Sequence, residues 1–178
     1  MSTSQNGFPA LASGSRLLHT WVIPAKHGTI KLTLRNGSAG FILAHLALYM
    51  AEVVAPWSIV RSKGNWGYAY RPIRGYSSTL SNHSSGTAMD LDAPRHPLGK
   101  VGTWTAKQVV KIHKRLAWRL YRGAIRWGGD YHGRKDEMHF EINVSLAVCE
   151  RVAKRLMRTP RGKRLLKANP GQKAVILS

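Results

Sequence analysis

The stretch FILAHLALYMAEVVAPW, residues 41–57, is the most apolar part of the chain, and any fold of this sequence has to bury it. Its apolar residues recur at helical spacing, with Ser38 placed to cap the start of the helix and Pro56 to end it. His45 and Glu52 interrupt the run, whereas a membrane span needs about 20 predominantly apolar residues. The stretch therefore predicts a buried helix in a globular domain rather than a membrane span.

Short strands and separate helices are predicted around this helix. TIKLTLRN (29–36) alternates apolar and polar residues, which indicates a strand or an extended arm. AMDL (88–91), AIRWGGD (124–130) and MHFEI (138–142) indicate further short strands. WTAKQVVKIHKRLAWRLY (104–121) has the pattern of an amphipathic helix. Together they predict a small α+β domain with a short, mainly antiparallel sheet flanked by helices.

The chain is expected to consist of one domain and two ends, since 178 residues suit a single domain with some additional chain. Residues 1–28 are expected to form a loosely ordered N-terminal arm, because they begin with many small and polar residues. Residues 29–158 form the expected domain, which closes with a helix over 143–157. Residues 159–178 are a basic C-terminal tail.

The charge balance restricts which kinds of molecule the protein is expected to bind. Twenty-eight Lys and Arg face eight Asp and Glu, a net charge of +20, and such a field favours a polyanionic partner. Nucleic acid, an anionic membrane and a phosphate-bearing cell wall all satisfy this condition. Cys149 is the single cysteine, which excludes an intrachain disulfide and a cysteine-rich zinc cluster. The N-terminus lacks the pattern of a signal peptide, so we expect synthesis and folding in a cytoplasm.

The few acids are not scattered among the many cations. Six of the eight carboxylates fall in two short windows, SNHSSGTAMDLD (81–92) and GGDYHGRKDEMHFEI (128–142). Each window also contains histidine. Acids that only balanced Lys and Arg would be spread along the chain, whereas carboxylates beside imidazoles are what a metal site requires. The two windows therefore predict a metal site.

Ligand chemistry suggests which residues hold the metal. His83, Asp90 and His139 supply two nitrogens and one oxygen, and a catalytic zinc ion usually has three protein ligands and a water. A turn through Gly86 followed by a short strand brings His83 and Asp90 together. Asp136, three residues before His139, is then placed to act as a general base.

Three further residues have more than one interpretation. Asp92 and Glu141 each follow a candidate ligand by two positions and so share its side of a strand. They can orient a histidine by hydrogen bonding, or form salt bridges with arginines, which we favour. His132 can be an additional ligand, a substrate contact or a solvent-facing loop residue, and we favour the last.

Both windows resemble a known family. SNHSSGTAMDLD matches the S-x-H-x-x-G-x-A-x-D signature of the VanY-like zinc peptidases, which include D-alanyl-D-alanine carboxypeptidases and phage L-alanyl-D-glutamate endopeptidases. DEMHFE matches the second block of that family, an acid three residues before a histidine. The resemblance covers roughly residues 30–145 and is strongest to the peptidase module of actinobacteriophage endolysins.

The resemblance implies roles for individual residues. It makes His83, Asp90 and His139 the ligands of one zinc ion and Asp136 the catalytic base. The family also uses an arginine upstream of the first block to bind substrate and stabilise the oxyanion. That arginine is either Arg71 or Arg74. Three further residues are expected to contact the substrate: Ser81, Tyr76 and His132.

The implied function is zinc-dependent hydrolysis of a peptidoglycan stem peptide by a phage endolysin, with L-Ala-D-Glu cleavage favoured over D-Ala-D-Ala cleavage. Anionic cell-wall polymers are expected to bind the basic surface, and the chain is expected to be a monomer without a stable nucleic-acid complex. It would be made in the host cytoplasm and reach the wall after release. Two alternatives remain: a basic nucleic-acid-binding protein, and a zinc-binding relative without catalysis.

Overall fold

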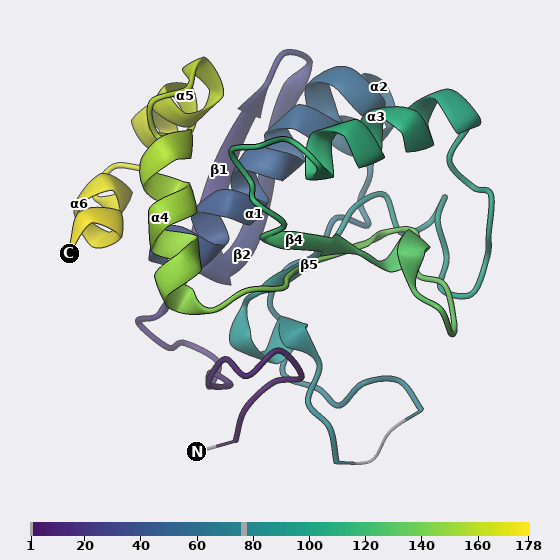
Figure 1. The fold of residues 1–178 in the computed structure, drawn as a ribbon, viewed down its shortest axis with the longest axis horizontal. Helices are drawn as coiled ribbons and strands as arrows, with labels where there is room; N and C mark the ends of the chain where they lie inside the picture. Colours follow the sequence, from purple (N-terminus) through teal and green to yellow (C-terminus); the bar gives the residue numbers. More distant parts are fainter. Residues whose placement is uncertain (1, 76–77) are drawn as a thin grey trace.

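The computed structural model describes residues 2–75 and 78–178 and confirms the predicted α+β class. It contains two antiparallel sheets, both short (Figure 1). A hairpin pairs β1 (Leu18–Ala25) with β2 (Gly28–Arg35). A second sheet has three strands in the order β3–β5–β4, comprising β3 (Ala88–Asp90), β4 (Ile125–Trp127) and β5 (His139–Ile142).

The apolar stretch forms the core helix that its sequence predicts. α1 (Gly37–Tyr49) continues into a π-helical turn, η1 (Met50–Val54), and contacts β1 as well as helices near the C-terminus. Residues 37–54 are long and apolar enough to cross a membrane, yet 83% of that stretch is buried inside the protein. Burial among neighbouring elements of the same chain is what a core helix requires.

The predicted ends of this helix need correction. Asn36, not Ser38, is the N-cap residue, and Ser38 is buried inside the first turn. The free backbone N–H of Gly37 donates to Oε1 of Gln172, 2.9 Å away, so a residue close to the C-terminus replaces a local cap. Pro56 does not simply end the helix, because it begins a second one, α2 (Pro56–Arg61).

The second sheet joins segments that are distant in sequence. β5 is its central strand, and Asp90 of β3 lies directly opposite His139 of β5. The long connection from β3 to β4 contains α3 (Ala106–Leu116), whose start is fixed by a capping box between Thr105 and Gln108. A 3-10 turn, η2 (Asn82–Ser85), precedes β3, and another, η3 (Gly128–Asp130), follows β4.

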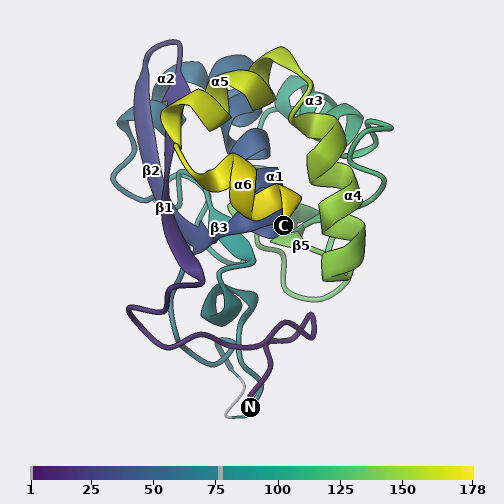
Figure 2. The same ribbon diagram turned by 90° about the vertical axis from the view of Figure 1, so that its left-hand side faces the viewer.

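Both ends of the chain are more structured than expected. The arm predicted over residues 1–28 contains β1, whose Trp21 and Ile23 are fully buried. The tail predicted over 159–178 forms two helices beside α4 (Leu146–Leu156), as Figure 2 shows. These are α5 (Pro160–Ala168) and α6 (Gln172–Leu177). Leu165 and Ile176 anchor them against α1, so burial of apolar side chains explains their order.

Candidate metal centre and cleft

A tight turn presents His83 to the sheet. Ser81 caps η2 and its Oγ accepts a hydrogen bond from the His83 backbone N–H, at 3.3 Å. Gly86 follows with φ +67, and a Cβ there would lie 2.5 Å from the backbone nitrogen of Arg35. Glycine therefore suits this position both for its backbone angle and for the closeness of β2. The chain then enters β3, which ends at Asp90.

Three candidate ligand atoms form a compact triangle. Nδ1 of His139 lies 2.9 Å from Oδ1 of Asp90, and Nε2 of His83 lies 3.2 Å from the former and 3.3 Å from the latter. All three side chains are buried. Bonds of about 2.0 to 2.1 Å in a tetrahedral zinc site place ligand atoms roughly 3.3 Å apart. Within the described ranges, this is the one cluster of three such side chains able to converge on a metal ion, and its donor set fits zinc.

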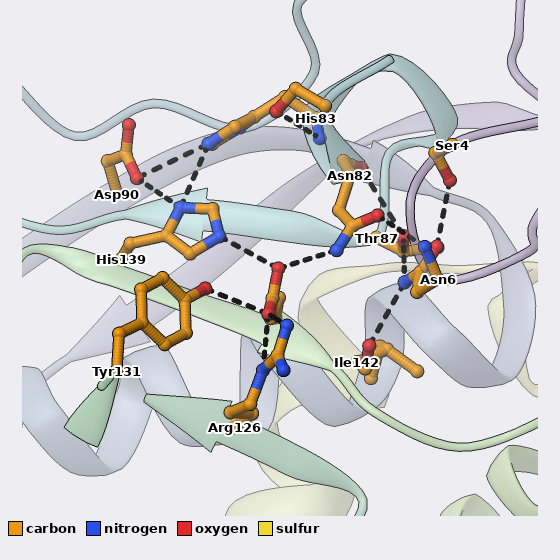
Figure 3. A network of polar contacts seen from close by, with 12 residues as sticks. Ser4, Asn6, Asn82, His83, Thr87, Asp90, Arg126, Tyr131, His139 and Ile142 are labelled. Atoms are coloured by element: carbon orange, nitrogen blue, oxygen red, sulfur yellow. Dashed lines mark hydrogen bonds and ion pairs between the residues drawn. The ribbon is translucent and has the colours of Figure 1, made fainter. Parts of the chain in front are cut away.

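Neighbouring acceptors set the orientation of both imidazoles. The carbonyl oxygen of Gly67 lies 2.5 Å from Nδ1 of His83, and Oε2 of Glu141 lies 3.1 Å from Nε2 of His139 (Figure 3). Each acceptor takes the ring N–H and leaves the lone pair of the other nitrogen directed at the triangle. Burial alone would raise the pKa of Asp90, but the two adjacent imidazoles hold it well below its usual range.

Glu141 both orients His139 by a hydrogen bond and forms a salt bridge with an arginine, the two roles considered for it. Besides His139, it accepts hydrogen bonds from Asn82 Nδ2 at 2.5 Å, from Arg126 Nε at 2.7 Å and from the Tyr131 hydroxyl at 2.8 Å. Burial opposes its ionisation, yet His139, together with the hydrogen bonds from Asn82 and Tyr131, lowers the pKa of Glu141 to about 2. The carboxylate is therefore an ionised acceptor that joins the metal centre to a salt bridge with an arginine.

Asp92 and Glu137 lie apart from this network. Asp92 is buried, and its Oδ2 is 3.4 Å from a guanidinium nitrogen of Arg95, in line with the salt bridge favoured for it. Glu137 accepts hydrogen bonds from the backbone of Gly102 at 2.7 Å and Thr103 at 2.8 Å. Glu137 holds the loop before α3 in place. This role explains why the second window contains an acid that lies away from the candidate ligands.

Asp136 provides a carboxylate beside the candidate ligands. Its backbone is fixed on both sides, since its N–H donates to Gly128 O at 3.0 Å and its carbonyl accepts from His139 N–H at 3.1 Å. Oδ1 of Asp136 is buried and has no hydrogen-bond partner among the residues that the structure describes. Burial is the main cause that raises the pKa of Asp136 to about 6. An unsatisfied, partly desolvated carboxylate is suited to accept a proton.

The metal centre opens into a cavity of about 680 Å³. Four arginines line its walls beside three acids: Arg71, Arg74, Arg126 and Arg134 with Asp130, Asp136 and Glu141. Ser81 and His132 also line it, His132 in an exposed loop. The charge of Arg74 opposes the rise in the pKa of Asp136. Tyr76, expected at the substrate, lies outside the described residues.

Sequence reasoning missed four residues that support the centre. Arg126 and Tyr131 hold Glu141, but Arg126 lies just before the second window, and Tyr131 within it is neither an acid nor a histidine. Asn82 stands inside the first window as an apparent spacer, yet it donates to Glu141. Asn6 contacts Asn82 from the expected loose arm, where nothing in the composition marked it.

Comparison with known proteins gives one match. A family model described as D-alanyl-D-alanine carboxypeptidase matches residues 74–142, which contain both histidine windows and all three strands of the second sheet. No curated protein and no solved structure matches the chain. The matched segment is less than half of the chain and excludes Arg71, residues 2–11 and α4 to α6. The similarity supports a metal-dependent peptidase at this cleft.

Proposed function

We propose that this chain is a zinc-dependent peptidase that hydrolyses an amide bond in the stem peptide of peptidoglycan. The observation that carries the proposal is the triangle of ligand atoms from His83, Asp90 and His139, which lies in the wall of an arginine-lined cavity beside the unpartnered oxygen of Asp136. A zinc ion held by these three residues would polarise the scissile carbonyl and acidify water.

The remaining chemistry belongs to side chains of the cleft. The Asp136 side chain, which lines the cavity, takes a proton from the attacking water and delivers that proton to the leaving amine as the C–N bond breaks. Arg71 or Arg74 donates to the carbonyl oxygen, where negative charge develops. A guanidinium supplies two parallel N–H donors, which also suits it to the carboxylates of a stem peptide.

Within this function we favour the internal L-Ala-D-Glu bond as the target, because the sequence windows are most similar to phage endolysin modules and because cutting inside the stem peptide opens a crosslinked wall. Carboxypeptidase activity on the terminal D-Ala-D-Ala bond is the second candidate. The description of the matching family model favours it. Both substrates carry carboxylates near the scissile bond, so the charge of the cleft suits either.

A basic surface on α4 and α5 is proposed to hold the enzyme on anionic wall polymers. No salt bridge in the described part of the chain involves five cations of these helices and their connection: Arg151, Lys154, Arg158, Lys163 and Lys167. Two neighbours differ, since Arg161 and Arg164 are paired with Glu52. In Figure 1, α5 and the upper end of α4 lie away from β5, the strand that carries His139, so we propose that a polymer bound there leaves the cleft free. We propose a monomer that acts on the wall after release from the cytoplasm.

The decisive experiment is incubation of the purified chain with peptidoglycan, with and without a zinc chelator, followed by analysis of new amino groups. An endopeptidase exposes the amino group of D-Glu, whereas a carboxypeptidase frees D-Ala. We expect release that the chelator and Asp136→Ala both abolish. Absence of release combined with tight DNA binding would overturn the proposal in favour of a nucleic-acid-binding protein.

Attachment to the wall has a separate test. Binding to purified walls is expected to weaken as salt rises through the physiological range, because exposed charges are screened over about 8 to 10 Å. Reversal of Lys163 and Lys167 to glutamate is expected to weaken it at low salt, while activity on soluble fragments stays unchanged. Wall binding that is insensitive to salt contradicts this part of the proposal.

A further inference from the structure

The N-terminal segment, residues 2–11, lies along the turn that carries His83. The backbone N–H of Gln5 donates to Leu80 O at 3.0 Å, and that of Leu11 donates to Ser84 O at 2.8 Å. Phe8 is buried at the centre of the segment. Figures 1 and 2 both show the chain near the N-terminus beside this turn. The contacts follow the turn on both sides of His83, so the segment is part of its support.

Asn6 is the residue of this segment that contacts Asn82, the neighbour of the candidate ligand His83. Its backbone N–H donates to Oδ1 of Asn82 at 2.8 Å. Its side-chain amide donates to Thr87 Oγ1 at 2.9 Å and to Ile142 O at 3.0 Å. Asn6 thus fastens together η2, the residue before β3 and the end of β5. Those are the elements that carry the three candidate ligands.

The bond from Asn6 determines which end of the Asn82 amide faces Glu141. The two ends of an amide have almost the same shape, so its orientation depends on its hydrogen-bond partners. With Oδ1 held by Asn6, Nδ2 of Asn82 points at Glu141 Oε2, 2.5 Å away (Figure 3). A reversed amide would set two acceptors against each other in a buried place.

The same carboxylate oxygen of Glu141 accepts the Nε2–H of His139, at 3.1 Å. An acceptor on this nitrogen fixes the plane of the ring and leaves Nδ1 free to bind a metal. A continuous chain of contacts therefore runs from Asn6 through Asn82 and Glu141 to a candidate ligand. Its members come from the N-terminal segment, η2 and β5.

We propose that Asn6 is a positioning residue of the metal centre. Its side-chain bonds to Thr87 and Ile142, which Asn6→Ala removes, hold its backbone N–H against Oδ1 of Asn82, so that Nδ2 of Asn82 faces Glu141 and Glu141 holds His139 with Nδ1 aimed at the metal. This inference rests on the proposed function only in that the cluster binds zinc. Loss of a partner of this kind commonly weakens metal binding 10- to 100-fold, so Asn6→Ala is expected to weaken zinc binding about tenfold.

The test measures zinc affinity directly, by competition with a chromophoric chelator, on the full chain and on Asn6→Ala. Asn169→Ala is the matched control. Asn169 also makes three hydrogen bonds to backbone groups, with Val22 N–H, Val22 O and Leu165 O, but between β1 and α5. We expect the control to lose thermal stability and keep its zinc affinity. The visible spectrum of the cobalt-substituted protein should change in Asn6→Ala alone.

A double-mutant cycle tests the route. In the Asn82→Ala background, Asn6→Ala is expected to cause no further loss of zinc affinity, because its effect passes through Asn82. Additive losses, or a zinc affinity of Asn6→Ala equal to that of the unchanged chain, overturn the inference. Asn6→Asp, which keeps the shape and loses both side-chain donors, gives a second measurement if Asn6→Ala does not fold.

The outcomes also separate this inference from the proposed function. Zinc binding by the unchanged chain without peptide hydrolysis contradicts the proposed function and leaves the role of Asn6 to be decided by the variants. Failure of the unchanged chain to bind zinc overturns both.

Discussion

Replacement of Gly128 by alanine tests whether the position of Asp136 controls the rate. A Cβ on Gly128 would lie 2.3 Å from the carbonyl oxygen of Asp136 and 3.0 Å from its Cβ, whereas ordinary contact begins at 3.4 Å. The closest atom is a backbone oxygen, which cannot rotate away as a flexible side chain can. The backbone of Asp136 therefore has to shift by about 1 Å. A misplacement of about 1 Å costs on the order of 100-fold in rate, and kcat/KM should fall by that factor.

The assay is the rate of amino-group release from peptidoglycan fragments, measured together with the zinc content of each variant. Gly133→Ala is the control, because Gly133 lies in the same loop and an added Cβ meets nothing within 4 Å. We expect the control to match the unchanged chain, and Gly128→Ala to retain zinc because β3 and β5 still hold their ligands. A folded Gly128→Ala variant that is as active as the control would refute the role of Asp136.

Three other outcomes are expected. Asp136→Asn should keep its zinc, which metal analysis checks, while its kcat for amino-group release falls about 100- to 10,000-fold. Removal of zinc with a chelator should abolish hydrolysis and lower the Tm, and added zinc should restore both. Burial, with the charges of Arg115 and Arg161, lowers the pKa of His45 to about 3, while an unfolded histidine titrates near 6.5. The contribution of neutral His45 to the free energy of unfolding is complete above about pH 6.5 and is lost as the pH falls towards 3. Between pH 7 and pH 5 the loss is about 2 kcal/mol. Denaturant unfolding at both pH values should show a smaller loss for His45→Gln than for the unchanged chain.

The candidate ligands could be found in the sequence because metal binding restricts residue type. Few side chains bind zinc, and in a chain with only eight acids their grouping beside histidines is conspicuous. Gly86 also gave a physical reason for the turn that joins His83 to Asp90. The residues that hold the candidate ligands in place could not be recognised in the sequence in this way. Asn6 and Asn82 are 76 positions apart, and an amide that bonds to backbone groups resembles any surface asparagine in a sequence.

Some elements of the fold could also be predicted from the sequence, and others could not. β2 and α3 follow from periodicity, whereas α1 is buried on all sides and follows from its apolar composition. α5 and α6 were predicted only as a basic tail, since short basic helices have little stability of their own. Tertiary contacts supply it, through the buried side chain of Leu165 and through Gln172, which caps α1. Such contacts depend on partners more than 100 positions away and cannot be seen in a local window.

The pairing of Asp90 with His139 also determines when the metal centre can exist. The two residues are 49 positions apart, and the loop between them contains α3 and β4. A chain still under synthesis holds His83 and Asp90 but lacks the third ligand until β5 has emerged and paired with β3. Closure of a loop of this length is slow compared with local helix formation. The candidate metal centre is therefore expected to form after the local helices, and zinc uptake can be used to follow its completion.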